Sequence, residues 1–298
     1  VVFPPLERRN RQRGPVAFTI QTAQGARLPG ALLLCLFWVV PSFAMGGQRP
    51  GSIASIRLFK QCESSEWQAH LDTYTAAVAA VGAARKKQKD LVKWNTFLNT
   101  QLPDKAQHAG KLTLSDMEVV MNWKITKHTF RPLMGQLKSN APALVEKATA
   151  DAFKIACKTE NGGKLVASEK YAKDSLAAIC VLRGIGPATA SAVLAHVNGN
   201  FPFMADEALE GCGLDRKYDV STYISLMKAL QGKAKDLGGH WNAEMVGRSL
   251  WTAAMAHVHK LKLAPCTTAA MTSESTAPST VTKNTTPKTA SKTKRKEA

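Results

Sequence analysis

The segment LRGIGPATA, residues 182–190, lies between two apolar stretches with helical spacing. Gly184 and Gly186 supply the backbone freedom that a tight turn between two helices requires. Pro187 suits the first position of the second helix, because its missing N–H would have no partner there. The small Ala188 that follows lets the two helices cross closely. The sequence therefore predicts a hairpin between two helices.

A turn of this kind points backbone N–H groups of its glycines and of the next helix outward. Because a helix N-terminus attracts anions, a DNA phosphate can dock there without any base being read. The residues expected to bind phosphate are Arg183, Gly184, Ile185, Gly186, Ala188 and Thr189. The alternative is a tight turn with a purely structural role, which an isolated Gly-x-Gly would favour. Nucleotide-binding loops are excluded, because no strand precedes the glycines and no Gly-Lys-Ser/Thr follows them.

The pattern Leu-x-Gly-apolar-Gly-x-x-Thr-Ala-x-x-x-Leu over residues 182–194 resembles the helix–hairpin–helix element of the DNA glycosylase superfamily, which includes the endonuclease III and MutY-type enzymes. Those proteins carry an aspartate after a stretch with Phe and Pro, and FPFMAD at 201–206 has the same spacing. The resemblance is strong over 176–210, extends in helix order over 64–262, and is absent from both tails. It implies an all-α, two-lobed fold with the hairpin and Asp206 at the cleft between the lobes.

The resemblance also makes Asp206 the candidate catalytic residue, because a carboxylate there assists the attacking water or stabilises the positive sugar. The substrate base must first leave the stack. Relatives with lyase activity have a lysine where this chain has Ala188, so no lyase activity is expected. Asp206 and Glu207 equally suit the start of a helix. The implied function is therefore either monofunctional base excision in DNA repair, or a non-catalytic DNA-binding or protein-interaction scaffold.

Basic residues near an aromatic stretch supply further candidate contacts. Lys124, Lys127 and Arg131 are expected to contact phosphates at the cleft, whereas Trp123 is expected to lie in the core. No metal site is expected, because the histidines near the last predicted helix have no carboxylate or cysteine at ligand spacing. The cysteine quartet that holds an iron–sulfur cluster in some relatives is missing. No cofactor is expected, apart from the monovalent cation that a hairpin of this type can hold.

Composition points to a polyanionic partner. The 298 residues include 40 Lys and Arg against 22 Asp and Glu, which gives a formal net charge of +18. Such a surplus favours nucleic acid, because binding releases counterions from the phosphate backbone. The six cysteines have no C-x-x-C spacing and indicate reduced thiols. We therefore expect DNA as the partner, a monomer, and a nuclear or cytoplasmic location.

The chain divides by composition into residues 1–44, a linker at 45–63, a helical domain at 64–262 and a disordered basic tail at 263–298. Residues 31–44 have the apolar run and small residues of a secretory signal. Two alternatives are a membrane-lying anchor and upstream translated sequence outside the native protein. Met45 is the first methionine, and we expect the native start there, with no membrane association. Secretion is expected only if 31–44 is a genuine signal.

Apolar periodicity predicts helices over residues 64–81, 91–102, 113–124, 143–157, 168–181, 187–197, 219–237 and 242–263. Thr113 and Asp116 have the spacing of a capping box at a helix start. Pro103 is expected to end the second helix, and the polar residues 103–111 are expected to form a loop. No convincing strand is present, so the pattern as a whole indicates an all-α fold.

Overall fold

The computed structural model describes residues 51–264, except 62, 160–164 and 166. Within these residues the regular structure is helical, apart from a single β-bridge between Thr159 and Leu165. The predicted all-α class is therefore confirmed. The helices are α1 (Ser52–Gln61), α2 (Ser64–Asp72), α3 (Tyr74–Ala84), α4 (Gln88–Asn99), α5 (Gln101–His108), α6 (Leu114–Lys127), α7 (Met134–Lys138), α8 (Pro142–Ala156), α9 (Glu169–Cys180), α10 (Pro187–Leu194), α11 (Asp206–Gly211), α12 (Val220–Leu237) and α13 (Ala243–His259).

The predictions for residues 1–44 and for the basic tail beyond Ala264 fall outside the described residues. Among the helices that the structure does describe, none combines the length and the apolar character needed to cross a membrane.

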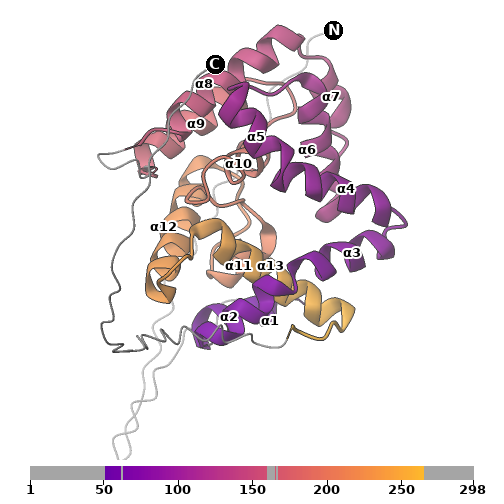
Figure 1. The fold of residues 1–298 in the computed structure, drawn as a ribbon, viewed down its shortest axis with the longest axis vertical. Helices are drawn as coiled ribbons and strands as arrows, with labels where there is room; N and C mark the ends of the chain where they lie inside the picture. Colours follow the sequence, from indigo (N-terminus) through magenta and orange to yellow (C-terminus); the bar gives the residue numbers. More distant parts are fainter. Residues whose placement is uncertain (1–50, 62, 160–164, 166, 265–298) are drawn as a thin grey trace, which may run out of the picture. The chain divides into compact units, whose positions relative to one another are not determined.

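The helix α10 lies where two groups of helices meet. Figure 1 shows α4 to α9 on one side of α10, and α11 to α13 with α1 and α2 on the other. The first and last helices of the described chain pack together, because α1 contacts both α11 and α13. The helix α10 contacts α6, α9 and α12. This arrangement places the predicted hairpin at the junction of the two groups.

Side chains at the predicted helix starts supply the caps that begin several helices. Thr113 Oγ1 accepts a hydrogen bond from the Asp116 backbone N–H, and the Asp116 carboxylate accepts one from the Thr113 N–H at 2.9 Å. The predicted capping box is therefore confirmed. Ser168, Asp219 and Asn242 cap α9, α12 and α13 in the same way, each accepting from a backbone N–H three residues on.

The prediction that Pro103 ends a helix is wrong. The preceding helix α4 ends at Asn99, and Pro103 is the third residue of α5, which occupies most of the predicted loop at 103–111. Proline is tolerated there because the first N–H groups of a helix have no partner within it. The buried Leu102 and Ala106 hold α5 against the core.

Residues 45–63, for which the sequence predicted a linker, contain the helix α1. Its buried face is formed by Ser52, Ser55 and Leu58 at helical spacing. The Ser55 hydroxyl donates to the Leu250 carbonyl of α13 at 2.9 Å. Since two of the three buried side chains are serines, the apolar periodicity that marks a core-facing helix is missing from this stretch.

Candidate nucleic-acid-binding site

The predicted hairpin is the turn at 181–186 between α9 and α10. Gly184 has a φ of +80°, in the left-handed region that L side chains rarely adopt. A Cβ at this position would lie 3.0 Å from the Leu133 carbonyl oxygen and 3.0 Å from Gln136 Cβ. Gly184 is therefore required both by the turn and by its close approach to α7.

The buried Asn140 fastens the hairpin to the segment between α7 and α8. Its side-chain amide donates to the Arg183 carbonyl at 3.0 Å and to the Leu137 carbonyl at 2.8 Å. Its side-chain oxygen accepts from the Arg183 N–H at 2.9 Å. Asn140 thus supports the turn through both backbone groups of Arg183. No sequence pattern indicated this role for Asn140, because Asn140 lies 43 positions from Arg183 in the chain.

Three backbone N–H groups of the hairpin donate to no other described residue, namely those of Gly184, Gly186 and Ala188. Gly186 is exposed, and a Cβ there would meet nothing within 4 Å. Because these amides stand at a helix start beside the exposed Arg183, they can receive an anion.

The other predicted phosphate-binding amides already have partners. The Ile185 N–H donates to the Leu182 carbonyl at 3.1 Å, and the Thr189 N–H donates to the Gly186 carbonyl at 2.9 Å. Their side chains are buried, as is that of Ala188. For Arg183, the available group is the exposed side chain, since its N–H is bonded to Asn140.

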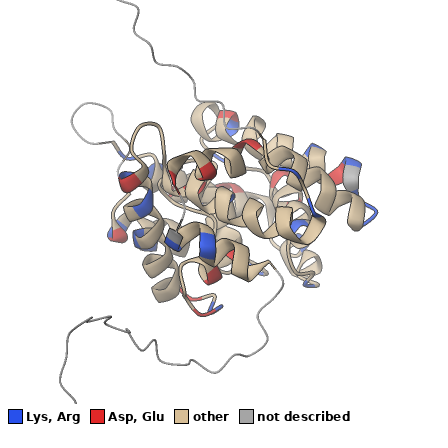
Figure 2. Cartoon of the chain, turned by 90° about the horizontal axis from the view of Figure 1, so that it is seen from below, with Lys and Arg blue, Asp and Glu red and all other residues tan. Residues whose placement is uncertain are grey.

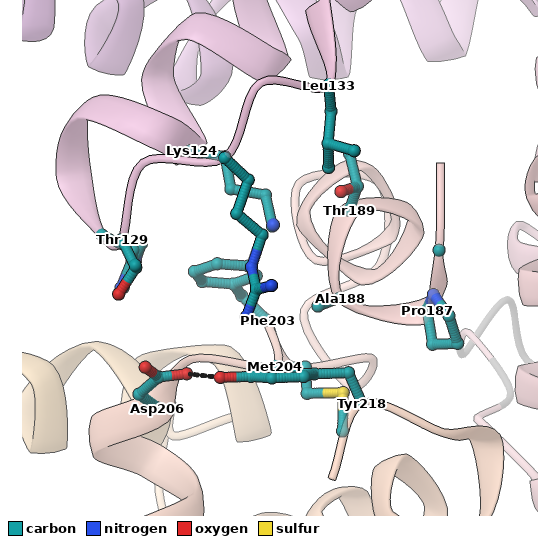
Figure 3. Close-up of a pocket in the computed structure, with 13 residues that line it drawn as sticks. Lys124, Thr129, Leu133, Pro187, Ala188, Thr189, Phe203, Met204, Asp206 and Tyr218 are labelled. Carbon is teal, nitrogen blue, oxygen red and sulfur yellow. Dashed lines mark hydrogen bonds between the residues drawn. The ribbon is translucent and has the colours of Figure 1, made fainter. Parts of the chain in front are cut away.

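A cavity of about 270 Å³ adjoins the hairpin. Its walls come from the end of α6 and the loop after it, the start of α10, the stretch before α11, and the loop before α12. The lining residues are Lys124, His128, Thr129, Arg131, Leu133, Gly186, Pro187, Ala188, Thr189, Phe203, Met204, Asp206 and Tyr218. The structure thus brings Asp206, Lys124 and Arg131 into one cavity with the hairpin, as Figure 3 shows for Asp206 and Lys124.

Asp206 is the first residue of α11 and is largely buried. Its carboxylate accepts a hydrogen bond of 2.7 Å from the Tyr218 hydroxyl (Figure 3). The Arg131 guanidinium lies 5.6 Å from the centre of the Tyr218 ring, within the range of a cation–π contact. Burial and, to a lesser extent, the hydrogen bond to Asp206 together raise the pKa of Tyr218 to about 12. Tyr218 is therefore a donor toward Asp206, and no sequence pattern indicated it.

Lys124 reaches the cavity from the wall opposite Asp206 (Figure 3). Burial lowers its pKa, and the nearby Arg131 charge lowers it further, while the Asp206 carboxylate acts in the opposite direction. Lys124 and Arg131 therefore both line the cavity, and their contact with phosphate stays a prediction.

Lys127 does not take the surface position that a phosphate contact requires. Its Nζ lies 4.1 Å from the ring centre of Trp251, 4.6 Å from that of Trp123 and 4.7 Å from that of Tyr74. It donates to the Tyr74 hydroxyl at 2.9 Å. Burial lowers the pKa of Lys127 to about 7. Three positions beyond Lys124, this lysine points into the core, which sequence reasoning seldom anticipates because buried lysines are rare.

A contact between a histidine and a carboxylate lies at the wall of the cavity. His128 Nδ1 stands 3.4 Å from Glu207 Oε2, with both side chains about nine-tenths buried. Burial lowers the pKa of His128, while its contact with Glu207 lowers the pKa of that carboxyl against the effect of burial. The His128 ring packs against Phe203, which lines the cavity, at 5.0 Å between ring centres. Trp123 packs on the same rings and is buried, so the prediction that it is a core residue is confirmed.

Among the described residues, no group of three or more His, Cys, Asp or Glu side chains is placed to hold a metal ion. Comparison of the chain with protein families, with curated proteins and with solved structures finds no match.

Proposed function

We propose that this chain is a DNA-binding protein in which the hairpin amides hold a backbone phosphate and the adjoining cavity receives an extruded base. The observation that carries the proposal is the shared cavity, which unites the hairpin with Asp206 and Lys124 from separate parts of the chain. This is the arrangement that the resemblance to helix–hairpin–helix DNA glycosylases implies. On this proposal the two groups of helices are the two lobes of that fold.

The electrostatics of the chain support a phosphate partner. About half of the net charge of +18 is carried by residues 51–264, so the surplus is not confined to the two ends. Figure 2 shows lysine and arginine residues spread over several helices. At the hairpin, three N–H donors stand beside Arg183, and each phosphate contact with such donors adds charge-assisted hydrogen bonds.

Residues of the loop between α6 and α7 favour the proposal that a base lies beside that phosphate. Thr129 and Arg131 line the cavity, while Phe130 between them is 67% exposed. An aromatic ring held in water at the rim of a cavity offers a surface on which a base can stack. The cavity is slightly smaller than the roughly 300–1,000 Å³ of pockets for drug-sized ligands, which suits a single base.

The proposed activity is monofunctional base excision. The bond between C1′ of the sugar and the base nitrogen breaks, and its electron pair leaves with the base. The oxygen of a water molecule bonds to C1′, and the water gives up one proton to a general base. On this proposal the Asp206 carboxylate, which lines the cavity, accepts that proton or stabilises the positive sugar. Ala188 stands where a Schiff-base lysine would be needed, so strand cleavage is not proposed.

A second candidate function is DNA binding without catalysis. The observation that favours it is that the Asp206 carboxylate is already engaged by Tyr218 at the start of α11. A carboxylate used to hold α11 against the loop before α12 would serve the fold rather than the reaction.

The binding proposal is tested by Gly186→Ala, measured by fluorescence anisotropy with a short duplex at several salt concentrations. The added methyl has space in the protein but intrudes beside the amides. We expect wild-type affinity to fall steeply with salt, and the variant to bind about ten-fold more weakly. Gly232→Ala in α12, where the Cβ also meets nothing within 4 Å, is the matched control and should bind normally. Salt-independent binding, or none, would favour a protein-interaction scaffold.

The catalytic proposal is tested by base-release assays on duplexes that carry different single lesions, with wild type and Asp206→Asn. We expect wild type to release at least one base, and Asp206→Asn to lose that release while keeping its affinity for DNA. If wild type releases no base from any duplex but binds them all, the non-catalytic function is the correct one.

A further inference from the structure

The cavity beside the hairpin carries more positive than negative charge. Two cations, Lys124 and Arg131, line it with a single carboxylate, that of Asp206. The Tyr218 hydroxyl already donates to this carboxylate, which reduces its capacity to compensate a further positive charge. A cationic ligand would therefore meet two like charges and a carboxylate that is already engaged, and like charges at close range cost free energy.

The cavity is also richer in hydrogen-bond donors than in acceptors. Lysine offers three N–H donors and arginine five, and neither side chain accepts. The amides of Gly186 and Ala188, which donate to no other described residue, add donors at the hairpin edge. A ligand that presents carbonyl oxygens can satisfy these donors, whereas one that presents only N–H groups leaves them unpaired.

The charged form of Lys124 is the one that a ligand in the cavity would stabilise most. It is partly buried, and it points into the cavity from the wall opposite Asp206 (Figure 3). Burial and, to a lesser extent, the nearby Arg131 charge disfavour its charged form and lower the pKa of Lys124. A carbonyl oxygen placed against Lys124 Nζ would offset both the burial and the repulsion, because hydrogen bonds to a charged group are stronger than neutral ones.

We propose that this cavity selects an uncharged base with carbonyl acceptors, as produced by deamination or oxidation, over a base that carries a positive charge, as produced by ring alkylation. The inference rests on the proposed function, because it assumes that the ligand is a base in DNA. Within that function it assigns the selection to Lys124, supported by Arg131.

The experiment compares three duplexes that differ at one position opposite thymine: adenine, hypoxanthine and 1-methyladenine. Hypoxanthine is an uncharged purine with a carbonyl, and 1-methyladenine is a cationic purine without one. A 2′-fluoro sugar at that nucleoside slows base loss, so that fluorescence anisotropy reports affinity alone. We expect wild type to bind hypoxanthine about ten-fold more tightly than adenine, and 1-methyladenine no more tightly than adenine.

The variant Lys124→Met keeps the apolar stem of the side chain and removes its charge. We expect this variant to lose the roughly ten-fold preference for hypoxanthine over adenine. If Lys124 instead contacts a phosphate, the substitution should weaken binding of all three duplexes equally. The ratio of the affinities for hypoxanthine and adenine therefore separates base selection from phosphate contact. Lys138→Met is the control for charge, because Lys138 is exposed on α7 and pairs with Glu118 away from the cavity. It should leave the ratio unchanged.

Two results would overturn this inference and leave the proposed function standing. One is a wild-type preference for 1-methyladenine together with salt-dependent DNA binding. The other is a hypoxanthine preference that Lys124→Met retains in full. If wild type binds none of the three duplexes, the proposed function fails, and the base selection fails with it.

Discussion

The Tyr218 hydroxyl donates a 2.7 Å hydrogen bond to the carboxylate of Asp206. It joins the start of α11 to the loop before α12, across 12 residues of chain. The orientation of the candidate catalytic carboxylate therefore depends on a tyrosine that is 37% exposed and that also faces Arg131. Both residues line the cavity.

Replacing Tyr218 by Phe removes that hydrogen bond and keeps the ring. We expect the free energy of unfolding to fall by about 1 kcal/mol, since the group is partly exposed. Base release should fall with it, because the carboxylate loses its positioning partner. Tyr171→Phe, on α9 and away from the cavity, is the control. Urea denaturation and base-release assays measure the two effects, and equal behaviour of the two variants would contradict the role given to Tyr218.

The two hairpin glycines are expected to respond differently to alanine. Gly184→Ala must place a Cβ 3.0 Å from the Leu133 carbonyl oxygen at a φ of +80°, so unfolding free energy should drop by at least about 1–3 kcal/mol. Gly186→Ala has neither problem, and it should change stability by less than about 1 kcal/mol. Denaturation curves for the two variants test this. Equal loss in both would show that the turn geometry described here is wrong.

Asn140→Ala should destabilise the hairpin, although Asn140 itself lies outside the hairpin, between α7 and α8. The substitution leaves the N–H and the carbonyl of Arg183 without their side-chain partner. A loss of about 1–3 kcal/mol in unfolding free energy is expected. Hydrogen exchange of the Arg183 amide should also become faster, whereas Asn122→Ala in α6 should not affect it. Unchanged protection of Arg183 in Asn140→Ala would remove Asn140 from this account.

The lowered pKa of Lys127 predicts how the free energy of unfolding depends on pH. Its pKa is about 7 in the folded chain, below the value of 10.5 for an unperturbed lysine. Between these two values the unfolded state binds more protons than the folded state, so stability should rise as the pH increases from about 7 to about 10. Below pH 7 both states are protonated, and the cost of the buried charge is fully present.

The check is Lys127→Met, which retains the apolar stem among the aromatic rings. The rise in unfolding free energy from pH 7 to pH 10 should be smaller in this variant than in wild type. Denaturant titrations at pH 7, 8, 9 and 10 provide the comparison. A rise of the same size in both proteins would mean that Lys127 is charged in the folded state throughout this range.

The helical class, the capped helix starts and the hairpin could all be predicted, because each depends on residues close together in the sequence. Thr113 and Asp116 lie three positions apart, and the turn is decided by Gly184 and its neighbours. The helix α1 escaped prediction because serines form much of its buried face. The prediction for Pro103 was wrong because proline breaks a helix interior but is tolerated in the first turn, and the start of α5 was not recognised.

The candidate site was predictable in part. The resemblance to the glycosylase superfamily implied that the hairpin and Asp206 lie close together, and both line one cavity with Lys124 and Arg131. Lys127 was misplaced, because a helix of mixed character gives no sign that one of its lysines faces a set of aromatic rings. Asn140 and Tyr218 act through contacts that only the fold creates, so the sequence alone offered no way to single them out.

We propose that the backbone amides of the hairpin hold a DNA phosphate. The most direct measurement is a titration of the ¹⁵N-labelled chain with a short duplex, followed by amide NMR spectra. We expect the amide signals of Gly184, Gly186 and Ala188 to shift together and to saturate, and added salt to reverse these shifts. If the duplex binds and shifts amides elsewhere while these three remain unmoved, the claim is contradicted.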